Sequence, residues 1–274
     1  MLNRVEKDKK EYYKEIFSDK KLEFCNYSND EEHVSVNDLV LTEEYNKLLP
    51  INTPIISVAG MGNKTDKYFI QLYLKKYFKE RNYKLDLVST KHYGGILGDI
   101  PMPSFLFSEN IFETNKVFLF NRFIKIIEQK NNPDLIILGI PNSVLPLNND
   151  NSDGFGIIPF LIFQAVKPDY SILSLYYDDY TKKYYEEIDL LMKYRFGSEI
   201  DCFNISNTRL DWMNLENETT RYLSINNFSN AIDVINKMKK YNYKNIININ
   251  RFNFNEIGFY IETQLKKHAN INIF

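Results

Sequence analysis

A lysine and a threonine follow an apolar segment and two glycines in PIISVAGMGNKTDK, residues 54–67. In a Walker A loop, GxxxxGK[ST], backbone N–H groups and the lysine bind phosphate oxygens, and the hydroxyl binds Mg²⁺. Aligned on that pattern, Lys64 and Thr65 would contact phosphate and metal, although Val58 and Asn63 stand where the pattern has glycine. The alternative is a solvated lysine beside a helix cap. We predict a degenerate phosphate-binding loop made of Gly60, Gly62, Asn63, Lys64 and Thr65.

Eight of the ten glycines follow the first three apolar segments that could be strands. Open α/β sheets bind ligands beyond the carboxyl ends of their strands, and glycine allows close approach of the backbone to a bound group. Tight turns alone would explain one or two glycines at each crossing. The sequence therefore predicts a site along this edge, with Gly94, Gly95 and Gly139 contributing to the binding loops.

Two acidic residues, Asp178 and Asp179, follow the fourth apolar segment, whereas the third, LIILGIP, lacks the acid that a Walker B strand would supply. Acids at strand ends can hold Mg²⁺, but acids in loops are often only solvated surface, and both interpretations stay open. His92, in STKHYGG, could act as an acid or base. If the chain is an enzyme, we predict phosphoryl transfer or nucleotide-dependent activation of a peptide group. Lys64 would stabilise phosphate charge, and Asp178 or Asp179 would place Mg²⁺ together with Thr65.

Short β-branched segments alternate with stretches of helical period from residue 54 onward. This alternation predicts an α/β fold with a doubly wound, mainly parallel sheet of six or seven strands flanked by helices. Strands are expected at 55–59, 85–89, 135–140, 171–177, 201–205, 222–225 and 245–250. Helices are expected at 65–81, 112–131, 155–167, 181–195, 229–242 and 254–268. Residues 1–50 are expected to form a partly helical arm, and 51–274 a single α/β domain.

Composition narrows the class of protein. The formal charge of −2 over 274 residues gives no broad basic surface for a nucleic-acid backbone. Cys25 and Cys202 show no zinc or redox spacing, which favours a reducing cytoplasmic compartment. The N-terminal segment is charged throughout, and no apolar segment approaches the ~20 residues that span a bilayer. We expect a soluble cytoplasmic protein without nucleic-acid or membrane partners.

Long segments of the chain resemble the peptide maturation system proteins of clostridial gene clusters for ribosomally made peptides. The resemblance runs from about residue 54 to 212 and includes GNKTDKYFIQL, LFNRFIKIIE, PDLIILGIPNSVLPLNN and YRFGSEIDCFNISNTRLDW. It implies a role in modifying or handling a precursor peptide, with that peptide or another maturation protein as partner. A looser similarity to P-loop proteins of the dethiobiotin synthetase kind implies binding of ATP or GTP with Mg²⁺.

Two functions of different classes are therefore open. One is nucleotide-dependent modification of a peptide, with the ligand phosphate at the loop of Gly60 to Thr65. The other is a non-catalytic adaptor whose loop binds nothing and whose surface holds a precursor peptide or a partner enzyme. Fold alone cannot choose between them.

Overall fold

The computed structural model describes residues 12, 15–20, 47–146, 153–210, 222–224, 236, 245–248 and 254–271. Most of the arm expected over 1–50 lies outside these residues, as does all but one residue of the helix expected over 229–242. Both therefore stay predictions.

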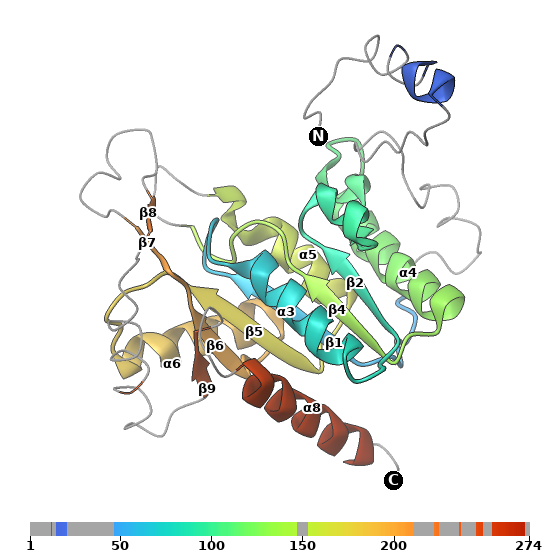
Figure 1. The fold of residues 1–274 in the computed structure, drawn as a ribbon. Helices are drawn as coiled ribbons and strands as arrows, with labels where there is room; N and C mark the ends of the chain where they lie inside the picture. Colours follow the sequence, from blue (N-terminus) through green and yellow to red (C-terminus); the bar gives the residue numbers. More distant parts are fainter. Residues whose placement is uncertain are drawn as a thin grey trace.

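A parallel sheet of seven strands forms the centre of the described fold (Figure 1), in the order β3-β2-β4-β1-β5-β6-β9. Every pairing in this sheet is parallel. The strands are β1 (Ile55–Gly60), β2 (Leu85–Ser89), β3 (Ile100–Pro101), β4 (Leu135–Gly139), β5 (Tyr170–Leu175), β6 (Cys202–Ile205) and β9 (Asn245–Ile247).

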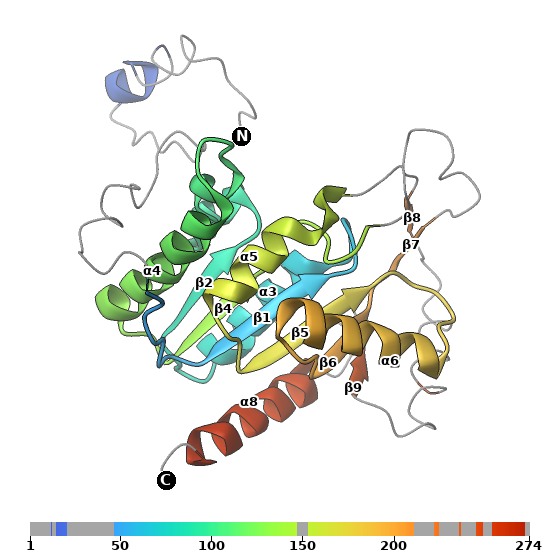
Figure 2. The ribbon, with the colours of Figure 1, turned by 180° about the vertical axis from the view of Figure 1, so that it is seen from behind.

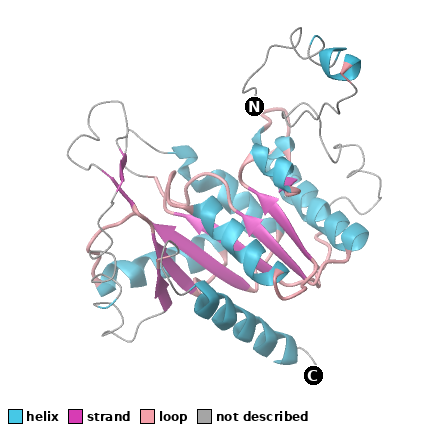
Figure 3. Ribbon diagram, viewed as in Figure 1, coloured by secondary structure: helices cyan, strands magenta, loops and turns pink. Residues whose placement is uncertain are grey.

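Helices cover both faces of this sheet (Figures 2 and 3). On one face, α3 (Lys67–Lys79) and α8 (Phe254–Ile271) enclose a core that includes Ile70, Leu74 and Ile261. On the other face lie α4 (Glu113–Asn131), α5 (Ile157–Ala165) and α6 (Lys182–Leu191), which continues as a π-helical turn over Met192–Phe196. The doubly wound α/β fold expected from the sequence is confirmed.

Strand β1 lies at the middle of the sheet and is buried along its whole length. Val58 lies beside Gly139 of β4 on one side and Ile172 of β5 on the other. A strand covered on both faces favours apolar side chains along its whole length, which explains the mainly apolar segment that predicted it in the sequence. Its one polar side chain, Ser57, is buried and donates to Ser171 Oγ at 2.9 Å.

The structure differs from expectation at the margins of the sheet. Residues 222–225 were expected in the main sheet, but β8 (Tyr222–Ser224) pairs antiparallel with β7 (Thr208–Leu210) as a separate ribbon. Strand β3 was not expected either. It is two residues long and ends in Pro101, which suits an edge because proline has no N–H to donate. Within the described residues, no helix is long and apolar enough to span a membrane.

Candidate functional site

Loops from three adjacent strands meet at the carboxyl edge of the sheet. Because β4, β1 and β5 are parallel neighbours, the segments that leave them start side by side. The backbone N–H of Val144 donates to Gly60 O at 3.1 Å, and that of Met61 donates to Ser174 O at 2.8 Å. The structure thus places Gly60, at the end of β1, between the ends of its two neighbouring strands.

The loop from Met61 to Asp66 joins β1 to α3 and is fastened to β5 through its backbone carbonyls. Tyr176 donates its phenolic hydroxyl to Asn63 O at 2.7 Å, and Ser174 Oγ donates to Thr65 O at 2.5 Å. Asn204, on β6, supports this arrangement by donating to Ser174 Oγ at 2.7 Å. With its carbonyls turned towards β5, the loop is held in one backbone shape.

Gly60 and Gly62 are needed for close packing within this loop. A Cβ atom on Gly60 would stand 2.4 Å from Thr65 Oγ1, and one on Gly62 would stand 2.1 Å from the hydroxyl oxygen of Tyr176. Neither space can accept a side chain. These two of the predicted loop glycines therefore let the loop fold back against its own threonine and against β5.

Lys64 and Thr65, the predicted phosphate and metal contacts, differ in their exposure to solvent. Lys64 is exposed, with a left-handed backbone (φ 59°). Thr65 is fully buried, and its hydroxyl donates to Gly62 O at 3.0 Å. Helix α3 begins at Lys67 rather than at residue 65 as expected. The Thr65 hydroxyl is thus turned into the loop.

Lys67, which the sequence reasoning passed over, is the first residue of α3 and reaches across the loop. Its ammonium donates to Asn142 O at 2.5 Å, and a Cβ on Gly60 would meet its side chain at 2.8 Å. If Lys67 is aligned with the lysine of GxxxxGK[ST], Asp66 stands where the pattern has its second glycine, and Tyr68 stands where it has Ser or Thr. Asp66 is left-handed (φ 59°). The signal available in the sequence was the second lysine, three residues after Lys64.

Asp66 adds a carboxylate at the start of α3. Its Oδ2 accepts from the backbone N–H of Asn207 at 3.0 Å, and Asn207 Oδ1 accepts from Asn248 Nδ2 at 3.0 Å. These contacts tie the loop to the segments after β6 and β9. A negative charge at a helix N-terminus stabilises the helix but also competes with an incoming anion.

The glycines after β2 lie in a 3₁₀ helix, His92–Leu97, which His92 begins. A Cβ on Gly94 would stand 2.7 Å from Ser89 Oγ and 2.8 Å from Asp99 Oδ2. Gly94 thus permits close packing around Ser89 and Asp99, and the binding role predicted for Gly94 and Gly95 stays a prediction, as does the acid–base role of His92.

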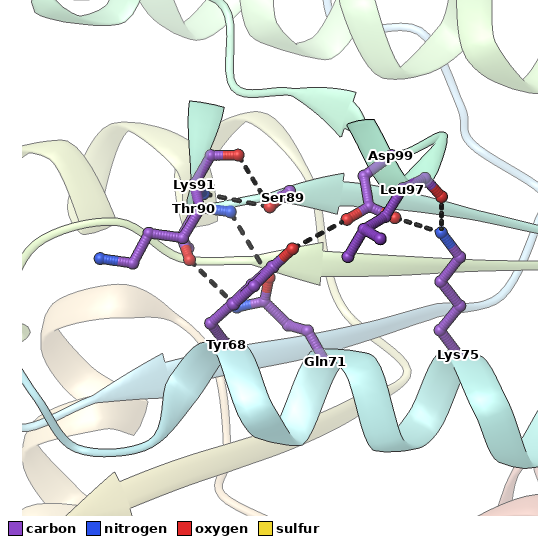
Figure 4. Close-up of polar contacts among 8 residues, drawn as sticks. All are labelled: Tyr68, Gln71, Lys75, Ser89, Thr90, Lys91, Leu97 and Asp99. Carbon is purple, nitrogen blue, oxygen red and sulfur yellow. Dashed lines mark hydrogen bonds and ion pairs between the residues drawn. The ribbon is translucent and has the colours of Figure 1, made fainter. Parts of the chain in front are cut away.

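A polar cluster joins this segment to α3 (Figure 4). The Tyr68 hydroxyl donates to Asp99 Oδ2 at 3.4 Å, and the ammonium of Lys75 forms an ion pair with Asp99 and donates to Leu97 O at 2.7 Å. Burial and the neighbouring Asp99 carboxylate raise the pKa of Tyr68 to about 12. Tyr68 is therefore a neutral hydrogen-bond donor at physiological pH.

Gly139, the last residue of β4, faces the side chain of Gln71. A Cβ on Gly139 would stand 2.6 Å from both amide atoms, Nε2 and Oε1. Gln71 is fully buried, and its amide exchanges two long contacts of 3.4 Å with Thr90, one with the backbone N–H and one with Oγ1. Gly139 thus makes room for an amide that belongs to α3.

The predicted acids lie just after β5. Asp178 is half-buried and Asp179 exposed, and Asp178 Oδ1 accepts from the backbone N–H of Asp179 at 2.9 Å. Burial and the Asp178 charge raise the pKa of Tyr184 to about 12. The Tyr184 hydroxyl donates to Met61 Sδ at 3.7 Å, which connects this acidic turn to the start of the β1–α3 loop.

Comparison with known proteins supports the fold. No protein-family model matches the chain, and no curated protein sequence does. The structure is similar to that of a DUF1611 family protein from Anabaena variabilis, with a TM-score of 0.57 and 11% identity over 95% of this chain and 77% of that one. At this identity the likeness shows the fold alone.

Two further solved structures are more distant. An LAO/AO transport system kinase aligns with a TM-score of 0.44 and 12% identity, over 86% of this chain and 66% of that one. Cobyrinic acid a,c-diamide synthase from Mycobacterium smegmatis, with bound ADP and magnesium, aligns with a TM-score of 0.37 and 12% identity, over 56% of this chain and 74% of that one. At these TM-scores neither likeness carries an argument about this chain.

Proposed function

We propose that the chain binds a phosphate-bearing ligand of the nucleotide class at the loop between β1 and α3. The observation that supports this most directly is Lys67. It stands at the first position of a 13-residue helix that begins at the carboxyl edge of the sheet, and its ammonium lies across the loop at Asn142 O. A helix N-terminus and a lysine at one loop both favour an anion.

In this proposal a phosphate oxygen takes the place of the Asn142 carbonyl as acceptor for Lys67. Exposed Lys64 lies in the same loop and adds a second positive charge. The bonds from Tyr176 and Ser174 hold the loop in its shape before the ligand arrives, which lowers the entropy lost on binding.

In this proposal the protein uses the bound ligand in the maturation of a ribosomally made peptide, a role that rests on the sequence resemblance. Its partners are a precursor peptide or another maturation protein. Co-purification of a tagged chain with such a peptide tests this role, and a chain that retains none in the presence of saturating nucleotide contradicts it.

A thermal-shift screen with ATP, ADP and GTP tests the phosphate site. A ligand at about 100 times its Kd adds about 2.7 kcal/mol of stability. At about 2–4 °C per kcal/mol, the melting temperature would rise by roughly 5–10 °C. Lys67→Ala should abolish most of this shift, and Lys64→Ala should reduce it.

Lys79→Ala is the matched control, because Lys79 is exposed in the last turn of the same helix. Lys79 lies twelve positions after Lys67 in the helix, a distance of roughly 18 Å at 1.5 Å per residue. An equal shift in the unchanged chain and in Lys67→Ala would contradict the proposed site.

A specific observation favours the adaptor as second candidate. Exposed apolar side chains gather where the start of α5 meets the π-helical turn, with exposed fractions of 57% for Phe155, 47% for Ile157 and 79% for Tyr194. Arg195 of that turn donates to Phe155 O, which holds the two segments together. If no nucleotide shifts the melting temperature while a precursor peptide binds here, the adaptor is the better account.

A further inference from the structure

The place where a P-loop protein holds Mg²⁺ is filled by protein side chains in this chain. A P-loop metal is held by the Ser or Thr that follows the phosphate lysine and by an acid at the end of a neighbouring strand. The residue after Lys67 is Tyr68, and β4, the neighbour of β1, ends in Gly139. Gly139 has no side-chain oxygen, and Tyr68 carries a bulky phenol in place of the small hydroxyl of Ser or Thr.

The space beside Gly139 is occupied by an amide. Gln71 lies one helical turn after Lys67, so both side chains leave the same face of α3. Lys67 lies against Gly60 of β1, where an added Cβ would stand 2.8 Å from the lysine side chain. Gln71 lies against Gly139 of β4, where an added Cβ would stand 2.6 Å from the amide. An acid at position 139 would require the fully buried Gln71 amide to move out of this space.

Three other oxygen donors near the loop are already engaged. Tyr68 directs its hydroxyl to Asp99, and the side chain of Asp99 is fully buried in its ion pair with Lys75 (Figure 4). Thr65, the predicted metal ligand, is fully buried and donates its proton to Gly62 O.

The acids near the loop do not converge on one point. Asp66 accepts from the backbone N–H of Asn207, and Asp178 accepts from that of Asp179. Within the described residues, no three His, Cys, Asp or Glu side chains come together as a metal site would require. The residues present therefore do not form the Mg²⁺ site that the sequence predicts from Thr65 and Asp178.

We infer that the site binds its phosphate ligand without a divalent metal, with Lys67 and the helix N-terminus providing the positive charge. The inference rests on the proposed phosphate site. It names the kind of ligand as the metal-free anion, such as free ATP or ADP, and it assigns Gln71 the role of filling the metal position.

Calorimetric titration of the full chain with ATP, once in excess EDTA and once in excess MgCl₂, tests the inference. We expect the Kd in EDTA to be equal to that in MgCl₂ or smaller. A Kd at least tenfold larger in EDTA overturns metal-free binding but leaves the phosphate site in place. Absence of binding in both buffers overturns the phosphate site itself, and the inference with it.

A double variant, Gln71→Ala with Gly139→Asp, tests the assigned position. Removing the amide opens the space, and the new carboxylate supplies a metal ligand next to Lys67. We expect ATP binding by this variant to become about tenfold tighter in MgCl₂ than in EDTA. Gln71→Ala alone controls for the lost packing and should show no metal dependence.

If the double variant is folded by circular dichroism and binds ATP equally in both buffers, the assignment of the metal position to Gly139 is wrong. If it does not fold, Gln71→Ala with Gly139→Ser decides instead, because the smaller hydroxyl donor needs less space. Metal-dependent binding by that variant supports the assignment, and equal binding in both buffers overturns it.

Discussion

The two edges of the sheet place different residues in left-handed backbone. Among the described residues, the turns that end α3 and α4 at the amino edge use Asn82 (φ 63°) and Asn132 (φ 44°). Asparagine is one of the few residues that adopts this conformation readily. At the carboxyl edge, besides glycines and one asparagine, the left-handed positions hold Lys64 (φ 59°), Asp66 (φ 59°) and Phe155 (φ 52°).

Residues such as lysine or phenylalanine in left-handed backbone cost about 1–3 kcal/mol each and persist where the surroundings hold them. Asp66 is held by Asn207, and Phe155 lies between two left-handed glycines with its carbonyl accepting from Arg195. Strain of this kind gathers at ligand sites. The comparison therefore supports the proposal that the ligand site lies at the carboxyl edge.

The amino edge also contains a charged group with a structural role. At the amino edge, Glu262 of α8 accepts from the phenols of Tyr77 and Tyr83 at 2.9 and 2.8 Å and from Lys266 at 2.6 Å. This carboxylate joins α3 to α8. We expect substitutions at this contact to change stability and leave ligand binding alone, and substitutions in the β1–α3 loop to change ligand binding.

The largest expected effect is at the contact between α8 and α3. A Cβ on Gly258 would stand 2.3 Å from the ring of Tyr77, which is itself buried. Gly258→Val should therefore lower the free energy of unfolding by about 3 kcal/mol through overpacking. Urea unfolding measures this, with Phe259→Ala, at an exposed position of the same helix, as the near-neutral control. A loss below 1 kcal/mol would mean that α8 packs less closely.

A smaller, pH-dependent loss is expected for Glu262→Gln. Burial alone would raise the pKa of Glu262, but the bonds from Lys266, Tyr83 and Tyr77 hold it below its usual value. A lowered folded-state pKa gives stability that is present above the unfolded pKa and is lost as the pH falls through the folded one. The variant should be about 2 kcal/mol less stable at pH 7.

That gap should narrow as the pH falls below the ordinary pKa of a glutamate and through the lowered folded-state pKa of Glu262, where the carboxyl group of the unchanged chain becomes protonated. Urea unfolding of both proteins across this range gives the measurement. A gap that is the same at every pH would show that the charge of Glu262 contributes nothing.

At the carboxyl edge, Asp66→Asn should tighten ligand binding, while loss of the charge that stabilises the N-terminus of α3 should lower stability by no more than about 1 kcal/mol. Asparagine keeps an oxygen for the Asn207 N–H and tolerates left-handed backbone, while the negative charge at the helix N-terminus is removed. A charge at that position is worth about 1 kcal/mol, so the Kd for ATP should fall about fivefold. Calorimetric titration measures it. An unchanged Kd would place the bound phosphate away from α3.

The smallest expected effect is a gain in stability from Phe155→Gly. Relief of left-handed strain, about 1–2 kcal/mol, outweighs the greater entropy of glycine in the unfolded chain, about 0.4–1 kcal/mol. The net gain should be about 0.5 kcal/mol in urea unfolding. Phe155→Ala, which removes the ring and keeps the strain, should show no gain. Equal gains in both variants would trace the effect to the exposed ring.

The sequence predicted the central strands because buried parallel strands are mainly apolar, as in LIILG of β4. It also predicted the edge of the sheet where the glycines gather. It could not show which lysine, Lys64 or Lys67, reaches across the loop. The start of α3 depends on left-handed backbone at Lys64 and Asp66, and lysine seldom adopts this conformation. Two lysines three residues apart also look equivalent in the sequence.

Contacts between distant segments were equally hidden. The fit of Gln71 against Gly139 joins residues 68 positions apart and leaves no periodic trace. The ribbon of β7 and β8 is too short for its pattern to show which sheet it joins.

The close fit of Gln71 against Gly139 also orders the mutational paths open to this protein. A carboxylate introduced at position 139 would displace the buried Gln71 amide from the space that it now fills. A smaller residue at position 71 would free that space but leave a cavity without any benefit to binding. Either change made alone would lower stability, so a metal ligand would be gained here through a less stable intermediate, and selection would favour keeping the two residues as a pair.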